Sequence, residues 1–175
     1  FINQVFPGVP SVFLYRNPAE VIASVKKATT AALTARGSSK GVFISGLTQK
    51  AQTPLSNTSY LAHCYAQYFK SVLDRPSLNV SCFEYPDITA GNLSLILRDG
   101  LNYCPTETQL SKMRQQFLFH SKDDGQTKQF IDDTQDKQAS VDAMDRALIE
   151  ALCGGFVDQI KMQQGGAEMR NARIA

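Results

Sequence analysis

The segment VFLYRNPAEVIAS, from Val12 to Ser24, constrains the fold more than any other stretch of the chain. Its first four residues are apolar or aromatic, which predicts a short, fully buried strand. A helix start follows, because Asn17 can cap a helix, Pro18 suits its first turn and Glu20 stands three residues after the cap. The strand therefore ends on the charge of Arg16, at the beginning of a helix.

Length and charge narrow the class of protein. The chain has 175 residues, enough for one domain with a substantial core, and its net charge is only +2. A charge this small gives no general electrostatic reason to expect nucleic acid or a membrane surface as partner, so any anion site must be local. No run of about 18 apolar residues occurs, and we expect no membrane segment in this chain.

The four cysteines are widely spaced, with no two close enough for a CxxC pair. We therefore expect reduced, mostly buried thiols and no zinc site. The cellular compartment stays open, with a cytoplasmic location favoured.

The patterns after Arg16 predict a series of helices and one further strand. A helix from Pro18 ends near Gly37, and residues 36–59 then read as a loop, either a lid over a substrate or a simple connection. The other predicted elements are a helix over 58–73, a strand over 78–85, helices over 90–101 and 106–119, and a last helix over 137–162. In this last helix we expect a bend at Gly154 and Gly155, with an inward face made by Val141, Met144, Leu148, Leu152, Phe156 and Ile160.

The order of these elements indicates an α/β fold. Helices separate the two strands, which favours βα units and a parallel sheet. Because two strands are few for a parallel sheet, and because the first residue is Phe1, we expect the sequence to begin inside a longer protein. Residues 1–163 would then form the C-terminal portion of a single domain, and residues 164–175 a polar, disordered tail.

Arg16 and Ser24 are the candidate anion-binding residues. Ligands of open α/β folds bind at the carboxyl ends of the strands, where a helix N-terminus also favours negative charge. A guanidinium there presents a fork suited to phosphate, and the Ser24 hydroxyl lies eight residues further on. The alternative is structural: Arg16 forms a salt bridge with Glu20 or another acidic residue, and Ser24 is a small helix-packing residue.

VFLYRNPAEVIAS resembles the 3'-phosphate-binding segment of the sulfotransferase superfamily, enzymes that use 3'-phosphoadenylyl sulfate (PAPS) as cosubstrate. That segment has an arginine at a strand end, an Asn/Asp-Pro turn, an acidic residue, and a serine eight positions after the arginine. The resemblance implies that Arg16 and Ser24 bind the 3'-phosphate of PAPS. It also implies a partial P-loop NTPase-like three-layer fold, a parallel sheet flanked by helices.

Two later segments are similar to the same family. LNVSCFEYPDI resembles a later strand, with Glu84 before Tyr85 and Pro86 in place of an acidic residue. FLFHSKDDGQTKQFIDDTQDKQ resembles the loop that closes over the nucleotide, which implies that Lys122 contacts the 3'-phosphate. Ser121 and Asp123 stand where the family has arginine and glycine, and the alternative for Lys122 is a solvated charged turn.

The 5'-phosphosulfate loop of the family has no counterpart in this sequence. The stretch ARGSSKG, from Ala35 to Gly41, follows a predicted helix and is interpreted as a loop. The catalytic residue is unknown: His63 is expected to pack or face solvent, and His120 adjoins the C-terminal loop. Since sulfuryl transfer in this family needs no metal, the pairs Asp123–Asp124 and Asp132–Asp133 are interpreted as solvated, and no metal is expected.

The resemblance implies that the intact protein transfers a sulfuryl group from PAPS to a hydroxyl or amine of a small-molecule or glycan acceptor. Residues 36–59 and the helix with Tyr60 and Tyr68 are candidates for the acceptor pocket, and this fragment alone is expected to be inactive. Two alternatives stay open: a P-loop nucleotide kinase-like protein, and a non-catalytic remnant or interaction module. The oligomeric state is not determined by the sequence.

Overall fold

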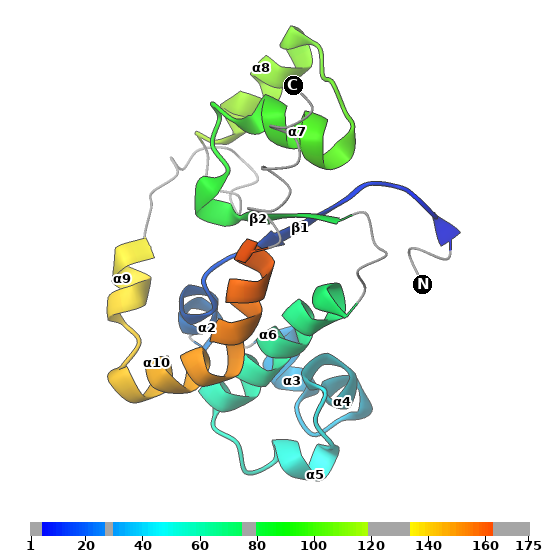
Figure 1. The fold of residues 1–175 in the computed structure, drawn as a ribbon. Helices are drawn as coiled ribbons and strands as arrows, with labels where there is room; N and C mark the ends of the chain where they lie inside the picture. The colour runs from blue at the N-terminus through cyan, green and yellow to red at the C-terminus, as the bar shows by residue number, and fades with distance from the viewer. Residues whose placement is uncertain (1–4, 27–29, 75–79, 119–133, 163–175) are drawn as a thin grey trace. The chain divides into compact units, whose positions relative to one another are not determined.

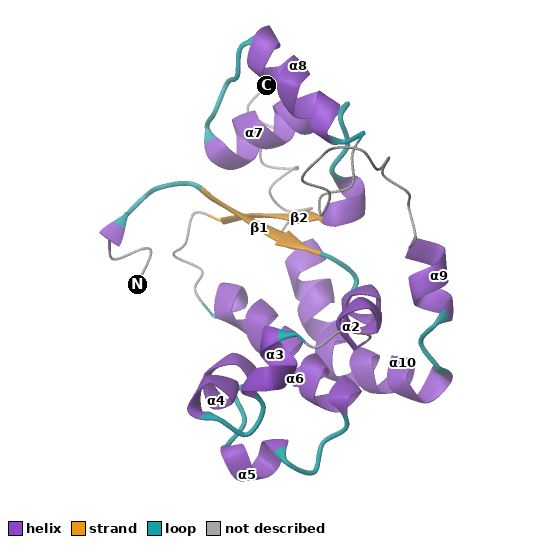
Figure 2. Cartoon of the chain, turned by 180° about the vertical axis from the view of Figure 1, so that it is seen from behind, coloured by secondary structure: helices purple, strands orange, loops and turns teal. Residues whose placement is uncertain are grey.

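The computed structural model describes residues 5–26, 30–74, 80–118 and 134–162. It is a mixed α/β structure in which helices predominate and the described strands form one small parallel sheet (Figure 2). Two compact units can be distinguished. The sheet unit comprises Phe1–Tyr15 and Ser77–Asp133, and the helical unit comprises Arg16–Pro76 and Thr134–Ala175.

The sheet unit contains the two predicted strands, β1 (Ser11–Tyr15) and β2 (Val80–Glu84). They pair in parallel, with Ser11 opposite Val80 and Tyr15 opposite Glu84. Phe13 and Tyr15 are buried, but Leu14 between them is 48% exposed, so the prediction of a fully buried strand is wrong: only the face of β1 with Phe13 and Tyr15 is buried. The prediction of two parallel strands separated by helices is confirmed.

In the described part of this unit, the strands are accompanied by α7 (Leu93–Leu101) and α8 (Glu107–Gln116), after a 3-10 turn, η1 (Tyr85–Asp87). α7 packs against both strands (Figure 1). A Cβ atom on Gly100 would lie 3.1 Å from the Phe83 ring and 3.2 Å from Val12, so glycine permits this close approach. Thr106 and Gln109 form a capping box that starts α8. Both predicted helices are confirmed.

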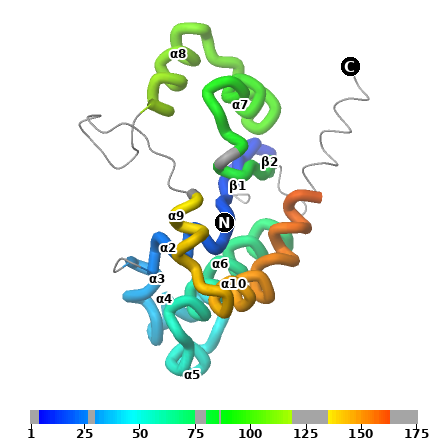
Figure 3. The backbone as a smooth tube through the Cα atoms, turned by 90° about the vertical axis from the view of Figure 1, so that its left-hand side faces the viewer, coloured from blue at the N-terminus to red at the C-terminus, as the bar shows by residue number. Residues whose placement is uncertain are grey.

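The helical unit is built around α6 (Asn57–Leu73), which confirms the helix predicted over 58–73. Four helices pack against it (Figure 3): α2 (Pro18–Lys26), α3 (Ala31–Ala35), α4 (Ser39–Ser45) and α10 (Ala143–Ile149). Tyr60 and Phe69 of α6 are completely buried. Ile22 of α2 and Ile149 of α10 belong to the same unit's hydrophobic core, together with Leu61.

The single helix predicted from Pro18 to Gly37 is wrong. The structure has α2 (Pro18–Lys26) and a separate α3 (Ala31–Ala35). Thr30 adopts an extended conformation (φ −107°, ψ 160°), and its hydroxyl accepts a hydrogen bond from the Leu33 amide as the N-cap of α3. The capping preference of threonine outweighs the helical spacing of Ala32 and Leu33.

The loop predicted over 36–59 is also wrong, because it contains α4 (Ser39–Ser45) and α5 (Gln49–Gln52). Ser38 caps α4 by accepting from the Gly41 amide at 3.2 Å, and Gly46 ends it at φ 70°. Thr48 caps α5 in the same way as Ser38 caps α4. The stretch ARGSSKG therefore opens a helix, contrary to its interpretation as a loop.

The last predicted helix, over 137–162, is divided as well. The structure has α9 (Thr134–Ala139), α10 (Ala143–Ile149), a π-helical turn η2 (Glu150–Gly154) and helical residues 155–162. Asp142 starts α10 by accepting from the Asp145 amide at 2.7 Å. Val141 and Ile160 are buried as predicted, but Met144 is 85% exposed. Met144 falls outside the expected face because the break at residues 140–142 resets the helical periodicity.

Candidate functional site

Arg16 directly follows β1 in the chain and stands two residues before α2 begins. Its Nε atom donates to the Glu20 Oε2 atom at 2.8 Å, forming a salt bridge. The Arg16 side chain is 24% exposed, whereas that of Glu20 is 2% exposed. The salt bridge named as the structural alternative is therefore present, and solvent still reaches part of the arginine.

The buried carboxylate of Glu20 has a second partner. Its Oε1 atom accepts a hydrogen bond from Nε2 of Gln138, on α9, at 2.7 Å. Burial of a charged carboxylate is costly unless both its oxygens are satisfied, and here Arg16 and Gln138 take one oxygen each. Glu20 thus joins the start of α2 to a helix far away in the sequence.

The backbone around Arg16 is held by two further hydrogen bonds. The Tyr65 hydroxyl, on α6, donates to the Arg16 carbonyl oxygen at 3.3 Å, and Asn17 Oδ1 accepts from the Ala19 amide at 2.9 Å. Burial raises the pKa of Tyr65 to about 12, so this hydroxyl keeps its proton at neutral pH. Asn17 is therefore the N-cap that the sequence predicts.

Ser24 lies on the same side of α2 as Glu20, since the two are four residues apart. Its side chain is half-buried. Arg16, Glu20 and Ser24 follow one another at intervals of four, which places a carboxylate between the two candidate phosphate ligands. The Ala19 amide donates to the Asn17 side chain, and the Glu20 and Val21 amides donate to the Asn17 carbonyl. An anion here would be bound mainly by side chains, with the helix dipole adding to them.

A cavity of about 310 Å³ lies on another side of α2, at a place that the sequence did not indicate. Lys26 Nζ and Asp145 Oδ2 form an ion pair there at 2.6 Å, and the Thr58 hydroxyl donates to the same oxygen at 2.8 Å. The hydrogen bond from Lys26, with a smaller contribution from Thr58, holds the pKa of Asp145 below its usual value. These groups come from three helices, so no local sequence signal reveals them. The cavity is lined by Ile22, Ala23, Lys26, Ser140, Val141, Asp145 and Ile149.

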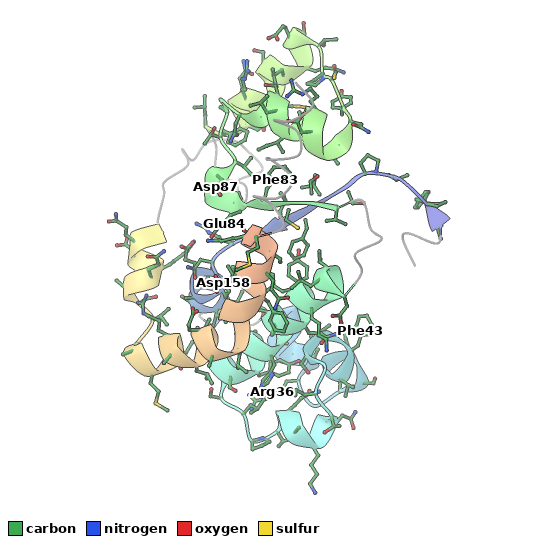
Figure 4. The ribbon with its side chains drawn as sticks, viewed as in Figure 1. Arg36, Phe43, Phe83, Glu84, Asp87 and Asp158 are labelled. Carbon is green, nitrogen blue, oxygen red and sulfur yellow. The ribbon has the colours of Figure 1, made fainter. Side chains whose placement is uncertain are left out.

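The candidate acceptor-pocket segment is organised by Arg36 (Figure 4). Its guanidinium donates to the carbonyl oxygens of Gln52 at 3.0 Å, Thr53 at 3.1 Å and Leu55. Its Nη1 atom also donates to the Asn57 side chain at 3.0 Å. Residues 36–57 thus form a hydrogen-bonded structure with two short helices, in place of the expected loop.

The other candidate residues of the sequence are placed as follows. His63 is half-buried on α6, and burial lowers its pKa, so the imidazole is neutral at pH 7. Lys122 lies outside the described residues, as do Ser121, Asp123 and His120. The acidic pairs Asp123–Asp124 and Asp132–Asp133 lie outside them too.

Among the residues that the structure describes, no three histidine, cysteine, aspartate or glutamate side chains gather where they could hold a metal ion. Within the same residues, none of the helices has the length and apolar character needed to cross a membrane. Cys64, Cys82, Cys104 and Cys153 are free thiols, and Cys82 and Cys153 are buried. Comparison with known proteins found no matching family model, no similar curated protein and no similar solved structure.

Proposed function

We propose that this chain is part of a PAPS-dependent sulfotransferase with a P-loop NTPase-like, three-layer fold, and that Arg16 and Ser24 bind the 3'-phosphate. One observation carries the proposal: Arg16 follows a parallel strand directly, precedes the capped start of α2 and keeps 24% of its side chain exposed. Strand, arginine and helix start in this order are the parts from which phosphate sites of open α/β folds are made. Lys122 would be a third ligand.

The charge distribution is compatible with this role. The positive charge of Arg16 is partly offset by Glu20, but the carboxylate is 2% exposed and the guanidinium 24%. An anion that approaches from solvent therefore meets the guanidinium first.

The chemical contribution of these residues would be binding and orientation. In sulfuryl transfer, a hydroxyl or amine of a small-molecule or glycan acceptor attacks the sulfur in line, and 3',5'-bisphosphoadenosine leaves. Holding the 3'-phosphate fixes the nucleotide end of PAPS, which aligns the sulfur with the acceptor. Arg16 and Ser24 take no proton in this step.

The test is calorimetric titration of the intact protein with 3',5'-bisphosphoadenosine and with adenosine 5'-monophosphate, which lacks the 3'-phosphate. We expect tighter binding of the bisphosphate, and Arg16→Ala to reduce its affinity by about 10- to 100-fold, the range for lost hydrogen bonds to a charged group. Arg16→Lys should keep only part of the affinity for the bisphosphate, because lysine lacks the planar fork of arginine. Arg98→Ala is the matched control, since Arg98 is exposed and paired with Asp99.

A second candidate is a structural or interaction module, favoured by the contact of Arg16 with the buried Glu20. This role predicts equal affinity for the two nucleotides and a loss of stability in Arg16→Ala. If bisphosphate binding survives Arg16→Ala, the proposed phosphate site is excluded and the structural or interaction module is favoured.

A further inference from the structure

We propose that Glu20 and Gln138 are positioning residues for Arg16, through which α9 sets the affinity of the site for a 3'-phosphate. This inference rests on the proposed function. Glu20 and Gln138 would act on the ligand only through the guanidinium.

Glu20 orients Arg16 before a ligand binds. The arginine side chain has several rotatable bonds, and holding such a chain in one conformation costs entropy when a ligand binds. Glu20 holds the guanidinium at the Nε atom, 2.8 Å away, before any ligand arrives. A fork that is oriented in advance binds phosphate more tightly than one that must be ordered on binding.

Glu20 is itself held in place. The carboxylate can hold Arg16 in one place only if it is fixed, and Gln138 fixes it by donating to the other oxygen at 2.7 Å. Without that amide, one buried oxygen would lose its partner, and the carboxylate would turn towards water and take the guanidinium with it.

The C-terminal end of α9 is itself anchored. Arg146 Nη2, on α10, donates to the backbone carbonyl of Gln138 at 2.7 Å and to that of Val141 at 3.4 Å. α9 also packs along α2. The chain of contacts therefore runs from α10 through Gln138 and Glu20 to Arg16, across 118 positions of sequence between Gln138 and Glu20.

The experiment compares the affinities of the intact protein for 3',5'-bisphosphoadenosine and adenosine 5'-monophosphate, and follows their ratio. We expect Gln138→Ala to lower this ratio by about 3- to 10-fold, because the Glu20 carboxylate loses one hydrogen bond and holds the guanidinium less firmly, and to leave the monophosphate affinity unchanged. Gln135→Ala is the matched control, because Gln135 is an exposed glutamine of the same helix. It should change neither affinity.

Glu20 variants separate positioning from simple charge. Glu20→Ala removes a negative charge near the site, so electrostatics alone would tighten bisphosphate binding, whereas loss of positioning weakens it. Glu20→Gln keeps an acceptor for Arg16 and should restore most of the ratio. Because Glu20 is buried and its alanine variant can lose the fold, Gln138→Ala at a half-buried position supplies the same test on folded protein.

The outcomes distinguish the two proposals. If the unmodified protein binds both nucleotides equally, the phosphate site is wrong and the positioning role fails with it. If Arg16→Ala abolishes the preference for the bisphosphate while Gln138→Ala and Glu20→Ala preserve it, the phosphate site stands and the positioning role is overturned.

Discussion

The guanidinium carbon of Arg36 lies 5.7 Å from the centre of the Tyr60 ring. The same guanidinium donates to the carbonyls of Gln52, Thr53 and Leu55, which close the segment between α4 and α6. A cation over an aromatic face that also satisfies several backbone acceptors is a strong local restraint. Arg36 therefore fixes the connection that precedes α6.

Arg36→Ala should lower the free energy of unfolding by about 2–4 kcal/mol, because several carbonyls lose a charged donor and the Tyr60 ring loses its cation. Arg36→Lys should recover less than half of this, since one ammonium cannot reach the same set of acceptors. Urea denaturation followed by circular dichroism measures both values.

The control for Arg36 is Arg98→Ala, which removes an exposed arginine of α7 whose salt bridge is to its neighbour Asp99. Exposed pairs contribute little to stability. Equal losses for Arg36→Ala and Arg98→Ala would show that the Arg36 hydrogen bonds do not restrain the fold.

Gly41 and Gly155 are both helical glycines, but alanine should affect them in opposite directions. A Cβ atom on Gly41 would meet the Ala35 carbonyl oxygen and lie 2.6 Å from Gln52 Oε1, so Gly41→Ala should cost about 1–3 kcal/mol. Nothing lies within 4 Å of a Cβ atom on Gly155, and Gly155→Ala should be neutral or stabilise by up to about 1 kcal/mol. Thermal unfolding of the two variants measures the contrast. A change in stability of the same sign in both variants would contradict the prediction.

Elements rich in consecutive or regularly spaced apolar residues were predictable from the sequence. The strands β1 and β2 and the helix α6 follow from apolar patterns that tertiary contacts reinforce. The breaks in the helices were not predicted, although Ser38, Thr48 and Asp142 are ordinary N-cap residues. Helical spacing alone does not reveal these breaks, because a cap becomes decisive only when the packing on each side of it favours different helix directions.

The local half of the candidate site was predictable as well. Arg16 and Glu20 are four residues apart, and the sequence offered their salt bridge as one of two alternatives. The partner of Glu20 on α9 was not predictable, because 118 positions separate the two residues. The same holds for Lys26 and Asp145, which are 119 positions apart. Contacts of this kind depend on how helices pack and leave no periodic trace in the sequence.

The ion pair of Lys26 and Asp145 should stabilise the fold down to acidic pH. Since the hydrogen bonds from Lys26 and Thr58 lower the folded-state pKa of Asp145 below its unfolded value, the stabilisation is complete above the unfolded value, about 4. It is lost as pH falls through the folded-state pKa. Asp145→Asn should therefore lower the free energy of unfolding by about 1 kcal/mol at pH 7, and this loss relative to the unmodified protein should shrink below pH 4. Urea denaturation at several pH values measures this.

Asp99→Asn serves as the comparison for Asp145→Asn. Asp99 also forms an ion pair, with Arg98, but both side chains are exposed, so solvent screens the interaction and the loss of stability should be smaller. If the difference in unfolding free energy between Asp145→Asn and the unmodified protein stays constant from pH 7 to pH 3, the charge of this carboxylate does not stabilise the fold.

Alkaline pH should destabilise the protein through its buried tyrosines. Burial is the main cause that raises the pKa values of Tyr15, Tyr60 and Tyr65 to about 12, against about 10 in the unfolded chain. Between these values the folded state binds more protons than the unfolded state, so the free energy of unfolding falls as pH rises from 10 to 12. Tyr65→Phe removes one such group and should show a smaller decrease than the unmodified protein. Urea denaturation at pH 9, 10 and 11 tests this, and an identical decrease in both proteins would refute it.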